Sequence, residues 1–287
     1  MRLGCHTITW GGVVGDPVGV TSVKDLHYRV NGPMDRAINE IGSLGYEGIE
    51  MFDGNVADFA ERPQELAALL ESAGVQLVGV YTGGNFIYDE ILPDELSRVT
   101  RAAELAAQFG ASSLVVGGGA RRASGTRGED YKRLAAALDQ VSDIASAHGL
   151  DACYHPHLTT IVESPEELDL LMPYTRIGFC PDTAHLAAGG GNPAELIRRY
   201  PDRVRHVHFK DARLSPLEFL PLGAGEIDFP AVLDALIETG YDGWLIVELD
   251  SYDGDPREAA AQSKTYLDRL LATTGPAATH PTIGESQ

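Results

Sequence analysis

The sequence has few basic side chains, few cysteines and no long hydrophobic run. Its 22 Lys and Arg residues stand against 42 Asp and Glu residues, which gives a formal net charge of −20. That charge repels phosphate backbones, so we expect no nucleic-acid partner. Because no stretch of about 18 apolar residues occurs, we expect neither a membrane span nor a membrane partner. Cys5, Cys153 and Cys180 each sit in an apolar run, which favours reduced thiols, and without a signal segment we expect a cytoplasmic protein.

What the sequence does contain is a repeated alternation of short β-branched runs and amphipathic stretches, typical of βα units around a parallel sheet. We predict eight strands, at residues 2–8, 46–52, 75–81, 112–118, 150–155, 176–182, 203–209 and 243–249. We predict helices at residues 33–44, 63–73, 94–109, 129–148, 165–172, 193–200, 230–239 and 256–271. Proline near the first turn and glycine after the last turn of several stretches mark helix starts and stops.

Eight such units predict an α/β fold, a single-domain (β/α)8 TIM barrel over residues 1–272, since such barrels usually take about 250 residues. A doubly wound open sheet is the alternative, but no G-x-G-x-x-G motif follows an early strand. Residues 273–287 are polar and rich in Pro, Gly, Thr and Ser, which predicts a disordered tail.

Polar residues gather at the carboxyl ends of the last four predicted strands, where the active site of such a barrel lies. They are His155 and His157 on the fifth strand, Asp182 and His185 after the sixth, His206, His208 and Lys210 on the seventh, and Glu248 on the eighth. Residues two apart share a strand face. Because these polar residues alternate with apolar ones, we expect most of their side chains to point into the barrel.

A cluster of His155, Asp182, His208 and Glu248 inside a barrel needs protons, hydrogen bonds or a cation to offset the cost of burial. A divalent metal ion is the simplest solution. Mixed nitrogen and oxygen ligands without thiolate suit Mn²⁺, Fe²⁺, Co²⁺ or Zn²⁺, with Mg²⁺ also open, and we expect Mn²⁺.

Taken singly, some of these residues have structural alternatives. Glu248 could pair with a neighbouring Lys or Arg, and Glu50, which closes the second strand, could be a site residue or an ion-pair partner. His206 lies one pleat deeper than His208 and is expected to be a hydrogen-bonded core histidine. The joint placement on four neighbouring strands favours the metal interpretation.

Four motifs resemble the xylose isomerase-like barrel superfamily of sugar isomerases, epimerases and lyases, over about residues 1 to 270. They are DTAH, HVHFKD, LGAGEIDF and YDGWLIVELD, which look like the family's D-x-x-H, H-x-H, G-x-G-x-I-D-F and Y-x-G-x-x-x-x-E segments. By this resemblance we expect Asp182, His208 and Glu248 to be metal ligands and His185 to contact substrate.

The YHPH motif at residues 154–157 departs from part of that superfamily. Its ketose epimerases place a Glu at the end of strand five as ligand and base, whereas His155 stands there in this chain. A histidine-rich strand five resembles inosose (2-keto-myo-inositol) dehydratases and the catalytic subunits of bacterial C-glycoside deglycosidases, which act on 3-keto sugars. CHTITWGG and YEGIEMFDGN fit the latter group at least as well.

The resemblance implies a metal-dependent lyase acting on a keto sugar or keto cyclitol. We expect the metal to polarise a ketone, a base to remove the α-proton and give a metal-bound enediolate, and the β-substituent to leave. His157 is the candidate base, or His155 if it is not a ligand, and Glu248 is a ligand and possible second base. Four residues are expected to bind substrate: Glu50, His185, Lys210 and Arg213.

The sequence leaves other functions open. A ketose or sugar-phosphate isomerase or epimerase is the nearest alternative. An endonuclease IV-like nuclease is less favoured because its positive groove conflicts with the net charge of −20, and a metal-free binding subunit is a third possibility. We expect an oligomer, and a deglycosidase would carry a second, small subunit.

Overall fold

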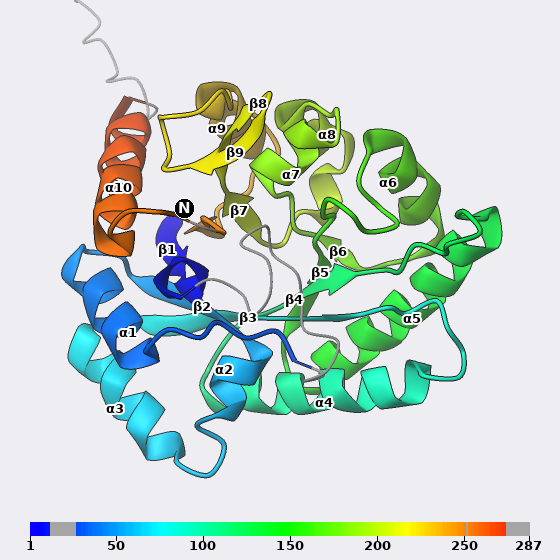
Figure 1. Ribbon diagram of the computed structural model, residues 1–287, viewed down its shortest axis with the longest axis horizontal. Coiled ribbons are helices and arrows are strands. Elements are labelled where there is room, and N and C mark those ends of the chain that lie inside the picture. The colour runs from blue at the N-terminus through cyan, green and yellow to red at the C-terminus, as the bar shows by residue number, and fades with distance from the viewer. Residues whose placement is uncertain (12–26, 251, 274–287) are drawn as a thin grey trace, which may run out of the picture.

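Eight parallel strands form the predicted TIM barrel (Figure 1). The computed structural model describes residues 1–11, 27–250 and 252–273. The barrel strands are β1 (Arg2–His6), β2 (Gly48–Phe52), β3 (Gln76–Gly84), β4 (Ser113–Gly118), β5 (Asp151–Tyr154), β6 (Gly178–Phe179), β7 (Val207–Phe209) and β10 (Trp244–Val247). They pair in the order β6, β5, β4, β3, β2, β1, β10, β7, so the first and last barrel strands of the chain are neighbours. The barrel prediction is confirmed, and no open doubly wound sheet forms among the described residues.

The barrel closes between β6 and β7, where both strands are short. Phe179 pairs with Val204, and Asp182 pairs with His208, in isolated parallel bridges. The His208 N–H donates to the Pro181 carbonyl at 3.0 Å. Pro181 has no N–H of its own for the ladder, which explains why the sixth strand ends earlier than predicted. The same bridge that closes the barrel also sets Asp182 beside His208.

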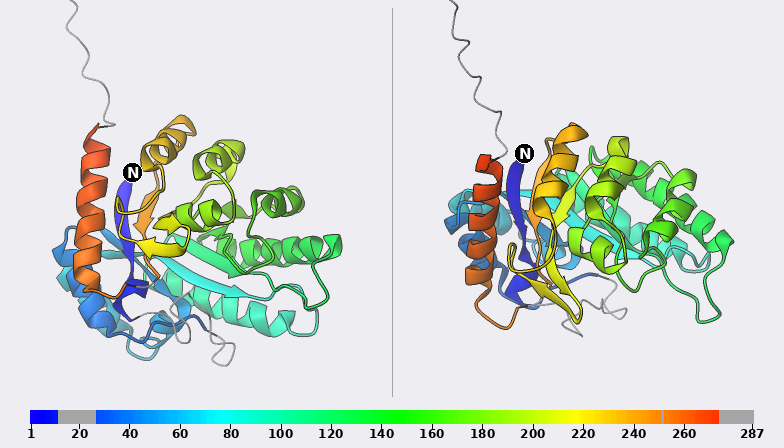
Figure 2. Two further views of the ribbon diagram at one scale, coloured as in Figure 1. Left: turned by 45° about the horizontal axis from the view of Figure 1, so that its top comes forward. Right: turned by 90° about the horizontal axis from the view of Figure 1, so that it is seen from above.

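Helices surround the strands and connect them (Figures 1 and 2). They are α1 (Met34–Ser43), α3 (Pro63–Ala73), α4 (Leu92–Gln108), α5 (Gly128–Ala147), α6 (Pro165–Leu171), α8 (Pro193–Arg199), α9 (Phe229–Glu238) and α10 (Pro256–Thr273). The predicted boundary signals are present: Pro165 begins α6, and Gly74 ends α3 in the left-handed region with φ 68°. Residues 274–287 of the predicted tail lie outside the described residues.

Several short elements were not predicted. They are α2 (Asp53–Ala57), α7 (Thr183–Ala188), the antiparallel hairpin of β8 (Asp211–Leu214) and β9 (Leu217–Leu220), and the 3-10 helices η1 (Thr7–Trp10), η2 (Met172–Tyr174) and η3 (Pro201–Arg203). Most lie within the connections between barrel strands and helices, where strand and helix periodicity give no signal. No helix in the described part of the chain is long and apolar enough to cross a membrane.

The barrel buries both apolar and polar side chains. Ile38 of α1 and Ile49 of β2 are fully buried in the large apolar core. His6, Glu50 and His206 are also fully buried, although each carries a polar group. The polar groups must therefore find partners within the protein.

Asp211, the first residue of β8, fixes the loop that follows the hairpin. Its carboxylate accepts hydrogen bonds from the N–H groups of Gly223 at 2.9 Å, Gly225 at 2.8 Å and Ile227 at 3.2 Å. A Cβ on Gly225 would lie 2.3 Å from Asp211 Oδ1. This close approach explains the second glycine of the LGAGEIDF motif.

We expect Gly225→Ala to lower the free energy of unfolding by about 1–3 kcal/mol, the usual cost of overpacking. Gly128→Ala is the matched control, because its Cβ would meet nothing within 4 Å and alanine favours the helix. Urea unfolding followed by circular dichroism measures both. Equal stability of the two variants would contradict the packed contact between Gly225 and Asp211.

Candidate metal centre and active site

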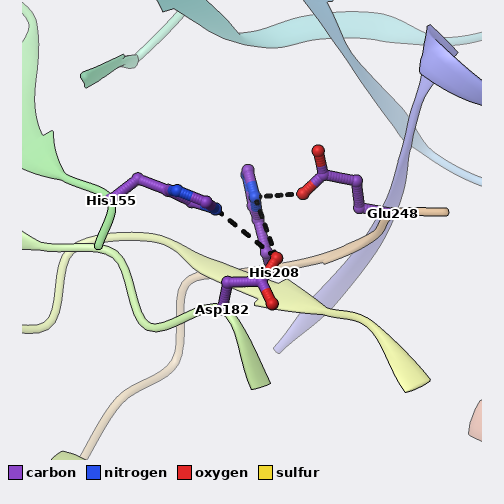
Figure 3. A group of neighbouring side chains, drawn as sticks. All are labelled: His155, Asp182, His208 and Glu248. Atoms are coloured by element: carbon purple, nitrogen blue, oxygen red, sulfur yellow. Dashed lines mark ion pairs between the residues drawn. The ribbon is translucent and has the colours of Figure 1, made fainter. Parts of the chain in front are cut away.

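Four buried side chains from four strands converge at the carboxyl end of the barrel (Figure 3). His155 follows β5, Asp182 follows β6, His208 lies in β7 and Glu248 follows β10. None is more than 5% exposed. The structure thus brings together the four residues predicted from the sequence, and we call them the ligand cluster.

The polar atoms of the ligand cluster converge without pairing well with one another. One ligand atom from each residue lies within 4.8 Å of the other three. His208 Nδ1 is 2.5 Å from Glu248 Oε2, and His155 Nε2 is 3.4 Å from Asp182 Oδ2. Within the described part of the chain, none of these four atoms makes an aligned hydrogen bond. Buried polar atoms of this kind, two nitrogens and two oxygens without thiolate, fit a divalent metal ion.

The ligand cluster is anionic because neighbouring groups outweigh the effect of burial. Burial raises the pKa of Asp182, but Lys210 and His185 hold that pKa well below its usual range. Burial also raises the pKa of Glu248, but His208 and Lys210 lower it far below its usual range. Burial lowers the pKa of His208, yet Glu248 and Glu50 raise it well above its usual value. The two carboxylates therefore attract positive charge to this position.

Glu50 hydrogen-bonds two histidines, one of which belongs to the ligand cluster. Its fully buried carboxylate accepts hydrogen bonds from His206 Nε2 at 2.6 Å and His208 Nε2 at 3.1 Å. Because His208 donates through Nε2, its Nδ1 is left facing Glu248 as a possible ligand atom. His206 is a hydrogen-bonded core histidine, as predicted. The hydrogen bonds to His206 and His208 give Glu50 a positioning role. The predicted contact of Glu50 with substrate stays a prediction.

A second polar group, of which His185 and Asp250 are buried and His157 is partly buried, adjoins the ligand cluster. His157, His185 and Asp250 offer ligand atoms within 4.8 Å of one another, and we call them the side cluster. Lys210 Nζ connects the two clusters, since it is 2.8 Å from Asp250 Oδ1, 3.0 Å from His185 Nε2 and 3.1 Å from Asp182 Oδ2.

The histidines of the side cluster are neutral at neutral pH. Burial lowers the pKa of His157 to about 4, and His155 and Lys210 add to that effect. Burial likewise holds the pKa of His185 well below its usual value. His157 Nδ1 lies 2.7 Å from the Leu158 carbonyl, which can only accept, so Nδ1 is the donor and Nε2 carries the lone pair. His157 can therefore accept a proton.

A small pocket is lined both by members of the two clusters and by apolar and aromatic side chains. Its lining residues are Ile8, Tyr28, Phe52, Tyr81, His155, His157, Glu248 and Asp250. Tyr81 packs edge-on against Tyr28, with ring centroids 5.0 Å apart, and against Phe52 at 5.5 Å. Such a combination suits a ring that carries hydroxyl groups on an apolar frame.

Some site residues were not predicted, and one predicted residue stands apart. Asp250 was missed, although it shares a strand face with Glu248, and burial raises its pKa to about 6. Phe52 and Tyr81 were missed because aromatic residues near strand ends are usually core. Arg213 lies on an exposed part of β8, where its guanidinium pairs with Glu218.

Comparisons with known proteins agree with this architecture. The model of the family described as xylose isomerase-like TIM barrel matches residues 38–270. An inosose dehydratase of Geobacillus kaustophilus strain HTA426 is 32% identical, over 94% of each chain. A solved structure of IolI protein with a bound zinc atom has TM-score 0.75 and 19% identity, and covers 96% of this chain and 100% of its own. The 3-keto-D-glucoside 4-epimerase YcjR from E. coli has TM-score 0.70 and 18% identity, with 94% and 99% coverage.

Asp182 has two roles that substitutions can separate. Its Oδ1 caps α7 by accepting from the N–H groups of Ala184 at 3.0 Å and His185 at 2.8 Å, while Oδ2 faces the ligand cluster. We expect Asp182→Asn and Asp182→Ala each to weaken Mn²⁺ binding about 100-fold or more. Asp182→Ala should also be about 1 kcal/mol less stable than Asp182→Asn, because only the amide keeps a capping oxygen.

Isothermal titration with Mn²⁺ and thermal unfolding measure the two effects. Asp151→Asn, at the exposed opposite end of β5, is the control and should bind Mn²⁺ like the wild type. Unchanged Mn²⁺ affinity in both Asp182 variants would rule out Asp182 as a ligand.

Glu50→Gln should weaken Mn²⁺ binding about 10–100-fold, because the amide holds the His208 ring less well than a carboxylate. Glu47→Gln is the control, since Glu47 is exposed and pairs with Arg2. The same titration applies. Wild-type affinity in Glu50→Gln would show that His208 does not depend on Glu50 for its orientation.

Proposed function

This chain belongs to the xylose isomerase-like TIM barrel family, and on that premise we propose that it is a divalent-metal-dependent lyase of a keto cyclitol or keto sugar. The observation that carries the proposal is a partly buried His157, whose Nδ1 faces the Leu158 carbonyl, beside a buried set of two nitrogen and two oxygen ligand atoms. The likeness to an inosose dehydratase over 94% of each chain makes dehydration of 2-keto-myo-inositol the first candidate reaction. Deglycosidation of a 3-keto C-glycoside is the second, supported by the YHPH strand end.

When bound, a divalent metal ion would polarise the substrate ketone and the neighbouring hydroxyl group. We propose Mn²⁺, held by the ligand cluster of His155, Asp182, His208 and Glu248. Zn²⁺, Co²⁺, Fe²⁺ and Mg²⁺ are the alternatives that oxygen and nitrogen ligands allow.

His157 is the proposed base, with His155 as a ligand rather than a base. The Leu158 carbonyl fixes His157 Nδ1–H, so Nε2 takes the α-proton of the substrate. The electrons of the C–H bond form the enediolate, which expels the β-hydroxyl and leaves a C=C bond. His157 returns its proton to the departing hydroxyl, so that water is released and the imidazole is neutral again. No further reactant is needed.

The residues around Lys210 would hold the substrate during this reaction. The Lys210 ammonium stabilises negative charge on an enediolate oxygen, and His185 and Asp250 bind ring hydroxyls. Glu248 is a possible second base. Arg213 stays a predicted contact only for a substituent long enough to reach the β8–β9 hairpin.

The alternative function is a ketose isomerase or epimerase, which shares the metal and the enediolate. We retain this alternative because the fold is similar to that of a 3-keto-D-glucoside 4-epimerase. A nuclease is less favoured because the net charge of −20 repels a phosphate backbone. Oligomer formation and a second small subunit remain predictions.

Product analysis in deuterated water separates these functions. Metal-loaded enzyme is incubated with 2-keto-myo-inositol, a 3-keto C-glucoside and a panel of ketoses, and the products are weighed by mass spectrometry. Loss of water or of an aglycone supports the lyase. Deuterium uptake without loss of a group would instead establish an isomerase or epimerase.

We expect His157→Ala to lower kcat about 10²–10⁴-fold, the usual contribution of a general base, while Mn²⁺ affinity stays within a factor of a few. His148→Gln, a partly buried histidine that follows α5, is the control and should keep wild-type kcat. Single-turnover rates and Mn²⁺ titration test the pair. A His157→Ala enzyme with wild-type kcat would remove His157 from the mechanism.

A further inference from the structure

Lys210 carries a fully buried ammonium group surrounded by polar atoms. Its Nζ lies 2.8 Å from Asp250 Oδ1, 3.0 Å from His185 Nε2, 3.1 Å from Asp182 Oδ2 and 3.4 Å from Glu248 Oε2. An ammonium has three N–H donors, so it cannot satisfy four neighbours equally. Three carboxylate oxygens and one imidazole nitrogen are the kinds of ligand that a divalent cation takes.

The side cluster supplies further ligand atoms around the same point. His157, His185 and Asp250 form a potential metal group of their own. Among the described residues, His185 Nδ1 and Asp250 Oδ2 are buried and have no hydrogen-bond partner. Asp182 Oδ2 belongs to the ligand cluster and also contacts Lys210, so it could bridge two cations.

We propose that the Lys210 ammonium takes the position of a second divalent cation and so keeps the metal centre mononuclear. This inference rests on the proposed metal site in the ligand cluster. Four buried carboxylates, Glu50, Asp182, Glu248 and Asp250, surround the centre and favour cations beyond a single metal ion. The Lys210 ammonium is one such cation, and because it is part of the chain it does not exchange with ions in solution. One ion stays available to the ketone, and the fixed charge lies beside it.

Removal of the ammonium should open the second position to a metal ion. We expect wild-type protein to bind one Mn²⁺ per chain at saturation and Lys210→Ala to bind two. The double variant Lys210→Ala/Asp250→Asn should return to one, because it lacks a ligand of the second position. Equilibrium dialysis with Mn²⁺ alone, followed by elemental analysis, gives the stoichiometry. Electron paramagnetic resonance should show spin coupling only in Lys210→Ala, since ions in two-metal sites lie about 3.5–4 Å apart.

The outcomes separate this inference from the proposed function. A wild-type protein that binds neither Mn²⁺ nor, dialysed with each in turn, Zn²⁺, Co²⁺, Fe²⁺ or Mg²⁺ overturns the metal site and with it both proposals. One ion in the wild type and one in a folded Lys210→Ala protein overturns only the role of Lys210. Two coupled ions in the wild type also overturn it, and that result needs no variant. Two ions in the double variant would place the second ion elsewhere and so contradict the inference.

Discussion

Buried negative charge is the constraint on which the catalytic half of this barrel depends. Glu50, Asp182, Glu248 and Asp250 are each at most 5% exposed, and they lie close together. Carboxylates in such a place destabilise the fold unless cations or hydrogen bonds compensate them. Glu50 is compensated by two histidines, and the other three share Lys210. The cation affinity of the centre follows from the charge that remains.

One of these carboxylates, Asp182, comes from the junction at which the barrel closes. β6 and β7 are the shortest barrel strands, and isolated bridges join them. Asp182 takes part in that junction, caps α7 and faces the ligand cluster. Barrel closure, the start of α7 and the proposed cation site therefore share one residue, and a cation in the ligand cluster would stabilise the closed barrel as well.

Much of the fold and of the ligand cluster could be predicted from the sequence because two regular signals coincide. Strand period 2 and helix period 3.6 located the eight units, and parallel strands bring their carboxyl ends together whatever the loops do. The hairpin β8–β9 and helix α7 were missed because they are short. Asp250 was missed because its role depends on Lys210, which approaches from another strand. The aromatic residues of the pocket were missed because Tyr81 has the pattern of a core residue.

The residues that line the pocket come from two different parts of the chain. Ile8, Tyr28, Phe52 and Tyr81 come from the first 81 residues, whereas His155, His157, Glu248 and Asp250 come from residues 155 to 250. Most groups of the proposed reaction thus lie in the second segment, although Glu50, which hydrogen-bonds His208, lies in the first. Changes at Ile8 or Tyr28 of the first segment could alter which ring is accepted, whereas a change at Glu50 would disturb the proposed ligand His208. A lineage that keeps the second segment together with Glu50 could therefore acquire new substrates while conserving its reaction.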